Sequence, residues 1–291
     1  MEALRRRIEA RVMSLSGLAL GQIDYEHPEG DPGLFGPDSM PWEVHSDFTS
    51  MLVGGIASLL LQMLHPLALA GVWDHSNFRQ DMLGRLRRTG QFVAGTSFAP
   101  TVSADWLIDK VRSIHLKVTG TAADGRRYAA SDPALLTWVH VAEVSCFLAG
   151  YLRYLNPQLS GAEQDRYYAE IALVAERLGA TDVPKSRQAV ADYLDAMRPQ
   201  LICDERTREI CRILLNAPAP SRSAVPISRL FMQAGIDLLP AWTQQQLGLQ
   251  QAAWQRPLIR AGVHSLAPIL RWAVRNGASH RSRKRMGLPP R

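Results

Sequence analysis

The segment from Ala104 to Val118 carries apolar side chains at the spacing of an α-helix. Apolar residues and one histidine recur three and four residues apart, which places them on one helical face. The set is Ile108, Val111, His115 and Val118. Such a face turns towards a core. A lone imidazole on it is typical either of a hydrogen-bonded core residue or of a metal or haem ligand.

Helical patterns cover most of the remaining chain. Asp132-Pro133 has the form of a helix start, and Ser160 to Glu163 has the form of a capping box. Proline disfavours helix in the residue before it, so one helix is expected to end at His65-Pro66. Besides a helix that starts near residue 103, the expected helices cover about 46–65, 78–92, 133–155, 160–179, 186–198, 205–215, 226–248 and 252–276.

Strand-like alternation is scarce, so the pattern predicts an all-α fold with a single multi-helix domain. Only 126–130 suggests a short extended piece, and 24–41, rich in Pro, Gly and Asp, is expected to form an ordered loop. We divide the chain into an N-terminal helix and linker (1–29), a main domain (30–250) and a basic C-terminal helix and tail (251–291).

The composition is that of an ordinary soluble globular protein, with 46% hydrophobic and 21% charged residues. The three cysteines follow neither a disulfide framework nor a zinc spacing, which fits a reducing compartment. The N-terminus lacks the apolar core of a signal peptide, and the longest apolar run, 51–64, is too short to span a bilayer. We therefore expect a cytoplasmic protein.

The net charge of +6 is unevenly placed. From residue 238 onwards there are nine Lys and Arg residues and no Asp or Glu. We interpret this stretch as a solvated, frayed tail. The alternative is a weak contact with a membrane surface or an acidic partner. No nucleic-acid-binding motif accompanies the charge, so no nucleic-acid partner is expected.

Two polar residues interrupt the apolar helix expected at 133–155. His140 and Glu143 lie one turn apart and share a face. Because the desolvation of ionisable groups is costly, they either stabilise each other inside the core or line a pocket.

Basic residues add a second cluster, since Arg85, Arg88 and Thr89 share one face of the helix expected at 78–92, and Arg112 precedes His115 by one turn. Arginines beside a buried imidazole suit a b-type haem, whose propionates need cations and whose iron needs an axial ligand. They suit a bound phosphate or carboxylate equally well.

Two non-haem iron sites can be weighed on spacing alone. A di-iron bundle needs Glu-x-x-His pairs, and the chain contains none. A site of two histidines and one carboxylate stays open, although nothing in the spacing selects it. Its candidate ligands are His65, His75, His115, His140 and Glu143.

Five motifs in order give the chain a resemblance to the MpaB / rubber oxygenase (latex-clearing protein) catalytic-domain family, over about residues 30–240. The motifs are Pro32–Ser39 (PGLFGPDS), Leu60–Pro66 (LLQMLHP), Arg85–Thr89 (RLRRT), Arg112–His115 (RSIH) and Tyr128–His140 (YAASDPALLTWVH). The resemblance implies an all-helical fold with a globin-like core. It also implies a b-type haem that cleaves isoprenoid carbon–carbon double bonds with O₂.

Carried over by motif, the resemblance makes His115 the proximal haem ligand and Arg112 its neighbour. Arg85 and Thr89 match residues of the distal helix, and His140 matches the Trp-x-His position. The chain departs from the family at Arg88, where the rubber oxygenases place a lysine able to ligate iron. A guanidinium cannot ligate iron, so the resemblance implies a sixth position that is open, filled by water or shielded by Arg88.

The sequence therefore predicts a haem b-dependent oxygenase that uses O₂ on a hydrophobic small molecule, such as an isoprenoid or lipid-like compound. Its expected catalytic residues are Arg85, Arg88, Thr89 and His140, and its haem-binding residues are His115 and Arg112. Two alternatives stay open: a non-catalytic module that binds an anionic or lipid-like ligand, and a non-haem iron enzyme.

Overall fold

The structure, a computed structural model, describes residues 1–219 and 221–289. These residues form fourteen α-helices, three short 3₁₀-helices and one two-stranded hairpin, which confirms the all-α fold class. The α-helices are α1 (Glu2–Leu15), α2 (Met40–His45), α3 (Phe48–Gln62), α4 (Pro66–His75), α5 (Met82–Phe98), α6 (Thr101–His115), α7 (Pro133–Tyr154), α8 (Gly161–Leu178), α9 (Arg187–Met197), α10 (Glu205–Leu215), α11 (Val225–Leu238), α12 (Ala241–Leu247), α13 (Gln255–Ala273) and α14 (Ala278–Arg285). The other elements are η1 (Gly17–Leu20), η2 (Arg198–Gln200), η3 (Arg222–Ala224) and the antiparallel pair β1 (Thr119–Thr121) and β2 (Arg127–Ala129).

Helices α3 and α7 pack against each other at the centre of the molecule. Their backbones approach closely through two glycines. An added Cβ would lie 2.8 Å from the Cys146 carbonyl oxygen at Gly54, and 2.6 Å from the Ser50 carbonyl oxygen at Gly150. Any side chain at either glycine would therefore push the two central helices apart.

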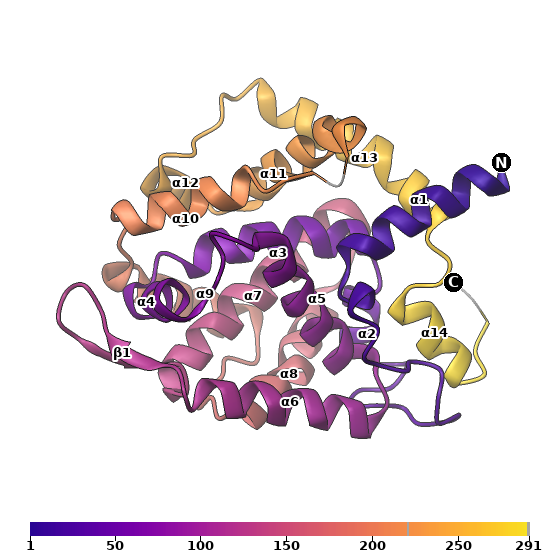
Figure 1. Cartoon of the computed structure of the whole chain (residues 1–291), viewed down its shortest axis with the longest axis horizontal. Helices are drawn as coiled ribbons and strands as arrows, with labels where there is room; N and C mark the ends of the chain where they lie inside the picture. Colours follow the sequence, from indigo (N-terminus) through magenta and orange to yellow (C-terminus); the bar gives the residue numbers. More distant parts are fainter. Residues whose placement is uncertain (220, 290–291) are drawn as a thin grey trace.

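The other helices surround this pair. Helices α10 to α13 lie along one side of α3, and α5, α6 and α8 lie on the opposite side (Figure 1). The β1–β2 hairpin and α14 stand at opposite ends of the molecule. Helix α7 is long and apolar enough to cross a membrane, but most of it is buried inside the molecule, as in a core helix of a globular fold.

Prolines mark two boundaries between consecutive helices. The helix expected at 46–65 is α3, which ends before Pro66 as predicted, and Pro66 begins a new helix, α4, bent by 103° from α3. His65 caps α4, since its Nδ1 accepts a hydrogen bond from the Ala68 N–H at 3.4 Å. The predicted helix at 226–248 is two helices, α11 and α12, with Pro240 between them. Pro66 is the first residue of α4, where its fixed φ suits the first helical turn, whereas Pro240 is the N-cap of α12.

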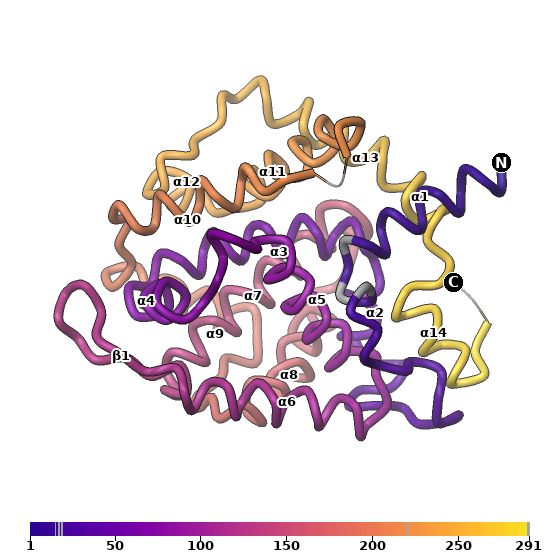
Figure 2. Tube along the Cα trace, viewed as in Figure 1, coloured from indigo at the N-terminus to yellow at the C-terminus, as the bar shows by residue number. Residues whose placement is uncertain are grey.

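The beginning and end of the chain lie together (Figure 2). The end forms α14, so the interpretation of a frayed tail was wrong for its described part. Arg285 is only 2% exposed, and its guanidinium donates to the backbone carbonyls of Tyr25, Asp31 and Phe98. These bonds order the loop expected at 24–41, whose last residues instead begin α2. Arg291 lies outside the described residues.

Candidate haem site

The apolar face predicted around His115 is present on α6. Ala104, Leu107 and Ile108 are buried, and Leu107 packs against Gly95 of α5, where a side chain would clash. Towards the end of α6 this face is less covered by other helices, since Val111 and His115 are only half-buried. The α5–α6 hairpin is therefore closed at its turn and more open at the end that carries His115.

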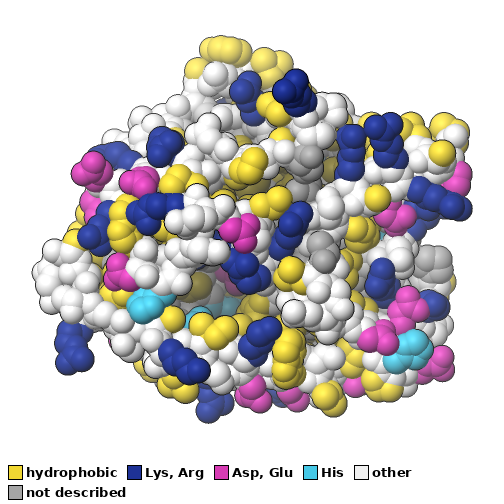
Figure 3. All heavy atoms as spheres, in the orientation of Figure 1, with side chains coloured by type: hydrophobic (Ala, Val, Ile, Leu, Met, Phe, Trp, Pro, Cys, Tyr) yellow, Lys and Arg dark blue, Asp and Glu magenta, His cyan; other side chains and the backbone are white. Residues whose placement is uncertain are grey.

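The surface is hollowed in this region. Figure 3 shows a hollow between α4, α5 and α6, with a histidine side chain (cyan) inside it. Helix α7 lies behind these elements (Figure 1). We use "central hollow" for this space. Five polar residues of the predicted site lie on α5, α6 and α7, namely Arg85, Thr89, His115, His140 and Glu143.

His140 is buried and Glu143 is half-buried on α7, and the two do not bond to each other. Among the described residues, neither side chain makes a hydrogen bond. Burial lowers the pKa of His140 to about 4 and raises that of Glu143 to about 7. A stabilising ion pair shifts the two pKa values in the opposite directions. Mutual stabilisation is therefore not what the structure supports, and pocket lining remains.

His115 has the same character. Burial lowers its pKa, so the ring is neutral at pH 7, which is the state that ligates metals. Its Nδ1 is buried without a hydrogen-bond partner among the described residues, and the other ring nitrogen is not enclosed in this way. A buried nitrogen without a partner is costly, so the core-histidine alternative, which requires a hydrogen bond, does not describe this side chain.

Two other buried histidines provide the comparison. His45 of α2 uses both ring nitrogens, with Nδ1 2.7 Å from Ser97 Oγ and Nε2 2.8 Å from Tyr167 Oη. His65 uses Nδ1 as the cap of α4. These rings are committed to the protein, whereas those of His115 and His140 are available to a ligand.

The basic residues of α5 divide into one inner and one outer arginine. Arg85 is half-buried, its guanidinium donates to Ser76 Oγ at 2.8 Å, and burial lowers its pKa to about 10. Arg88 is exposed and lies 3.5 Å from the Asp81 carboxylate. Thr89 is exposed too, and so is Arg112 on the outer side of α6. Of the two arginines that were predicted beside the site, Arg85 and Arg88, only Arg85 is partly removed from solvent.

His45 was missed in the sequence because the helix there was expected to begin at residue 46. A signal for it exists. Ser39 is followed by Pro41, and the Ser39 hydroxyl accepts a hydrogen bond from the Trp42 N–H at 3.3 Å. A serine followed by proline in the first helical turn is typical of a helix start, so α2 was predictable. The bonds that its histidine makes to α5 and α8 were not.

The described residues hold no group of three or more His, Cys, Asp or Glu side chains that could bind a metal ion. The five residues considered for a non-haem iron site therefore do not assemble into one within the part of the chain described. A haem needs fewer iron ligands from the protein, because the porphyrin supplies four of them and one imidazole is enough to attach the iron. His115, with its unpaired and neutral ring, fits that requirement.

Comparison with known proteins identifies the family. The sequence model described as "ER-bound oxygenase mpaB/B'/Rubber oxygenase, catalytic domain" matches residues 42–272. The match includes four of the five motifs; the fifth, Pro32–Ser39, precedes it. No curated protein and no solved structure matches the chain. The match spans most of the sequence, and the chain belongs to the MpaB / rubber oxygenase catalytic-domain family, a family of oxygenases.

Proposed function

We propose that this protein is a haem b-dependent oxygenase that uses O₂ to oxidise a hydrophobic small molecule, such as an isoprenoid or lipid-like compound. The observation that carries the proposal is His115, a neutral imidazole of α6 whose buried Nδ1 has no partner among the described residues, in a chain from an oxygenase family. His115 would hold the haem, and the haem iron, when bound, supplies the activation of O₂.

Arg85 is suited to binding a carboxylate. Even with its pKa lowered to about 10, its guanidinium is charged at neutral pH. Its surroundings exclude much of the water that would weaken an ion pair, and only one hydrogen bond, to Ser76, is formed among the described residues. We assign it to a haem propionate or to a polar group of the substrate.

Glu143 and His140 would handle protons near the substrate. With a pKa of about 7, Glu143 can hold a proton on one Oε or release it near neutral pH. His140 is neutral, so its ring offers one N–H donor and one acceptor nitrogen. These groups orient a polar end of the substrate, while apolar side chains packed beside them, such as Val144 and Phe92, exclude water from the rest.

An absorption spectrum tests the proposal directly. The full chain is produced with ample haem and iron and purified, and the Soret band is compared among wild type, His115→Ala and His264→Ala. His264 is an exposed histidine of α13 and serves as the matched control. We expect a Soret band in the wild type and in H264A, and at least a tenfold lower haem content in H115A.

A wild-type protein without a Soret band overturns the proposal, and so does a band of equal intensity in H115A. In either case metal analysis of the same preparation distinguishes the non-haem iron alternative from the binding module. Oxygen consumption by the haem-loaded protein with candidate isoprenoids then identifies the substrate.

A further inference from the structure

Helix α13 turns an apolar face towards solvent. Trp254, at its N-cap, is 66% exposed, Leu258 is 63% exposed and Ile269 is 47% exposed. Figure 3 shows hydrophobic side chains (yellow) at the edge of the molecule where α13 begins. The residues of this face are three and four positions apart, so they form one stripe along the helix, which is about 28 Å long. We call "outer stripe" the set Trp254, Leu258, Ala261, Ser265, Ile269 and Trp272.

The charged residues of α13 lie away from the outer stripe and are held by the protein. They are three arginines. Arg256 and Arg260 donate to the buried Asp237 carboxylate, each at 2.7 Å, and Arg271 donates to Asp47 at 2.7 Å. A surface helix usually buries its apolar side and keeps its charges in water. An exposed apolar stripe without a charged residue marks instead a surface that meets a membrane or another protein.

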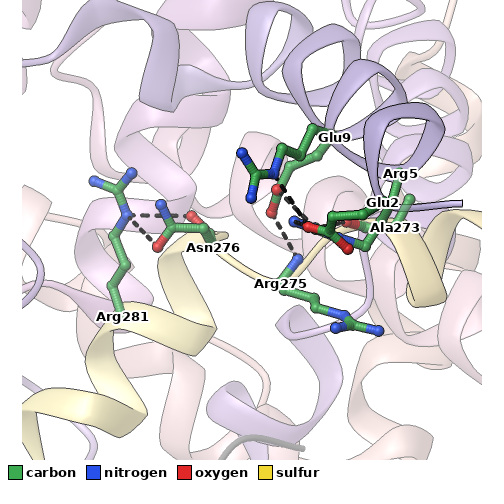
Figure 4. Close-up of polar contacts among 8 residues, drawn as sticks. Glu2, Arg5, Glu9, Ala273, Arg275, Asn276 and Arg281 are labelled. Atoms are coloured by element: carbon green, nitrogen blue, oxygen red, sulfur yellow. Dashed lines mark hydrogen bonds and ion pairs between the residues drawn. The ribbon is translucent and has the colours of Figure 1, made fainter.

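Helix α1 adds unpaired cations beside the end of α13 (Figure 4). Arg5 donates to the Ala273 carbonyl oxygen at 2.8 Å, which fixes α1 against this end. Arg7 and Arg11 of α1 are exposed, and neither forms a hydrogen bond or an ion pair within the part of the chain that the structure describes. The Arg275 guanidinium points away from these contacts and has no such partner either. The cations available to a partner are therefore these three.

The charge of this region distinguishes a membrane from a second copy of the chain. Residues 210–291 contain one acidic residue, Asp237, whose side chain is buried and already paired. The carboxylates of α1, Glu2 and Glu9, bind Arg5 of the same helix. A second copy docked through the same face would bring like charges together without a free carboxylate between them.

An anionic membrane surface supplies the charge that a second copy lacks. Each Lys or Arg near such a surface is attracted to it. Trp254 and Trp272 stand at the two ends of the outer stripe, and tryptophan is enriched at the boundary between lipid head groups and acyl chains. Both the charge and the aromatic residues thus favour a lipid surface.

We propose that the outer stripe, together with the exposed arginines of α1, is a docking surface for a membrane that contains anionic phospholipids. Helix α13 lies flat on the membrane, because its other side is packed against the body of the protein. Trp254, Leu258 and Ile269 enter the head-group boundary, and Arg7 and Arg11 contact phosphate groups. The stripe is already exposed, so docking needs no rearrangement of the fold.

Sedimentation of the full chain with lipid vesicles tests the apolar part of this surface. The vesicles contain phosphatidylcholine, either alone or with about 30% phosphatidylglycerol. The variant Trp254→Ser/Leu258→Ser removes two side chains of the stripe, and serine suits the N-cap position of Trp254. Its matched control is Val102→Ser/Trp106→Ser, at exposed apolar residues of α6.

We expect the wild type to bind the vesicles that contain phosphatidylglycerol and to bind phosphatidylcholine alone at least about tenfold more weakly. W254S/L258S should lose about tenfold in affinity for the anionic vesicles, because two apolar side chains no longer enter the lipid. V102S/W106S should bind like the wild type. Equal losses in the two double variants would overturn the proposal, and so would a wild type that binds neither kind of vesicle.

Arg7→Gln/Arg11→Gln tests the charge independently and serves if the α13 variant is unstable. It should bind the anionic vesicles about tenfold more weakly, and the remaining binding should depend less on salt. Equal binding of the wild type to both kinds of vesicle would overturn the role of anionic lipid. Sedimentation velocity without lipid completes the test. We expect a monomer; a wild-type dimer that W254S/L258S abolishes would assign the outer stripe to a second copy instead.

Discussion

The arginine cluster around Asp237 and the central hollow differ in how their ionisable groups are paired. In the arginine cluster, Asp237 has a fully buried side chain that accepts hydrogen bonds from Arg153, Arg256 and Arg260. In the central hollow, His115, His140 and Glu143 have no partner among the described residues. The first region uses charge to hold helices together, and the second keeps its polar groups available.

This contrast shows that the amount of charge does not indicate where function lies. The excess of basic residues near the C-terminus was interpreted as a solvated, frayed tail, with a membrane or an acidic partner as the alternative. Yet Arg256 and Arg260 bind Asp237, Arg271 binds Asp47 and the Tyr154 carbonyl, and Arg285 binds backbone carbonyls. A group that the protein itself satisfies has little left to offer a ligand, so pairing is the better guide.

The largest expected effect comes from breaking the arginine cluster. Burial alone raises the pKa of a carboxyl, but hydrogen bonds from Arg260 and Arg256 hold the pKa of Asp237 below its usual value. Asp237→Ala leaves three arginines facing one another. Breaking a buried pair costs 3–5 kcal/mol, and partial exposure of the arginines lowers this to about 3 kcal/mol of unfolding free energy, measured in urea.

Asp105→Ala is the matched control, because Asp105 pairs with Arg177 at the surface and both side chains are more than 40% exposed. Its unfolding free energy should change by less than about 1 kcal/mol. Equal losses in D237A and D105A would show that the arginine cluster is no more structural than a surface pair.

The fold was largely predictable because most helix boundaries follow local rules. Ser160 forms the predicted capping box with Glu163, and Asp132 caps α7 as expected. One error came from a proline. Pro240 separates α11 from α12 inside the helix expected at 226–248, whereas the helix end predicted at His65-Pro66 is confirmed. The contacts of α14 with the loop at 24–39 join residues more than 240 positions apart, and no local pattern encodes them.

A pair of histidine variants sharpens the contrast between committed and available groups. His45→Ala removes a buried ring and two hydrogen bonds, so the unfolding free energy of the haem-free protein should fall by about 2–3 kcal/mol. His115→Ala removes a half-buried ring without a hydrogen bond and should cost less than about 1 kcal/mol. Urea titrations of both variants measure this. A loss in H115A as large as in H45A would mean that His115 is a structural residue.

The candidate site was only partly predictable. The spacing placed His115, and His140 with Glu143, on helices, and both helices are present, although α6 ends at His115 and leaves Val118 outside it. Whether an imidazole has a partner depends on other elements, however, as Ser97 and Tyr167 demonstrate for His45. Arg85 and Arg88 looked equivalent in the sequence. Their different burial arises from the Asn77–Asp81 turn, where Arg88 finds its partners.

The pH dependence of stability tests whether Glu143 lacks a partner. Its pKa rises from the ordinary 4.5 to about 7 in the folded protein, so between these values the folded state binds more protons than the unfolded state. Stability is therefore lost as the pH rises from about 4.5 to about 7. Glu143→Gln removes this loss. Its unfolding free energy relative to wild type should rise across that window by about 2 kcal/mol, with the full shift discounted for remaining exposure.

Glu163→Gln is the control for this profile. The hydrogen bonds from Ser160 lower the pKa of Glu163, so it is ionised in both states above about pH 5. The E163Q difference should therefore stay constant from about pH 5 to about pH 8. A flat E143Q difference over the same range would show that Glu143 has found a partner.

The smallest effect is expected at Arg88, the position where the chain departs from its family. Arg88 is exposed, with its guanidinium 3.2 Å from Asn77 Oδ1 and paired with Asp81, so Arg88→Lys should change the unfolding free energy by less than about 0.5 kcal/mol. An amine that loses its proton can ligate iron, which a guanidinium cannot. In haem-loaded protein, R88K should therefore move the absorption spectrum towards a six-coordinate form. The shift should be partial, because the lysine is also held by Asp81. An unchanged spectrum would mean that residue 88 belongs with the paired, outer charges and that Arg85 alone is the cation of the central hollow.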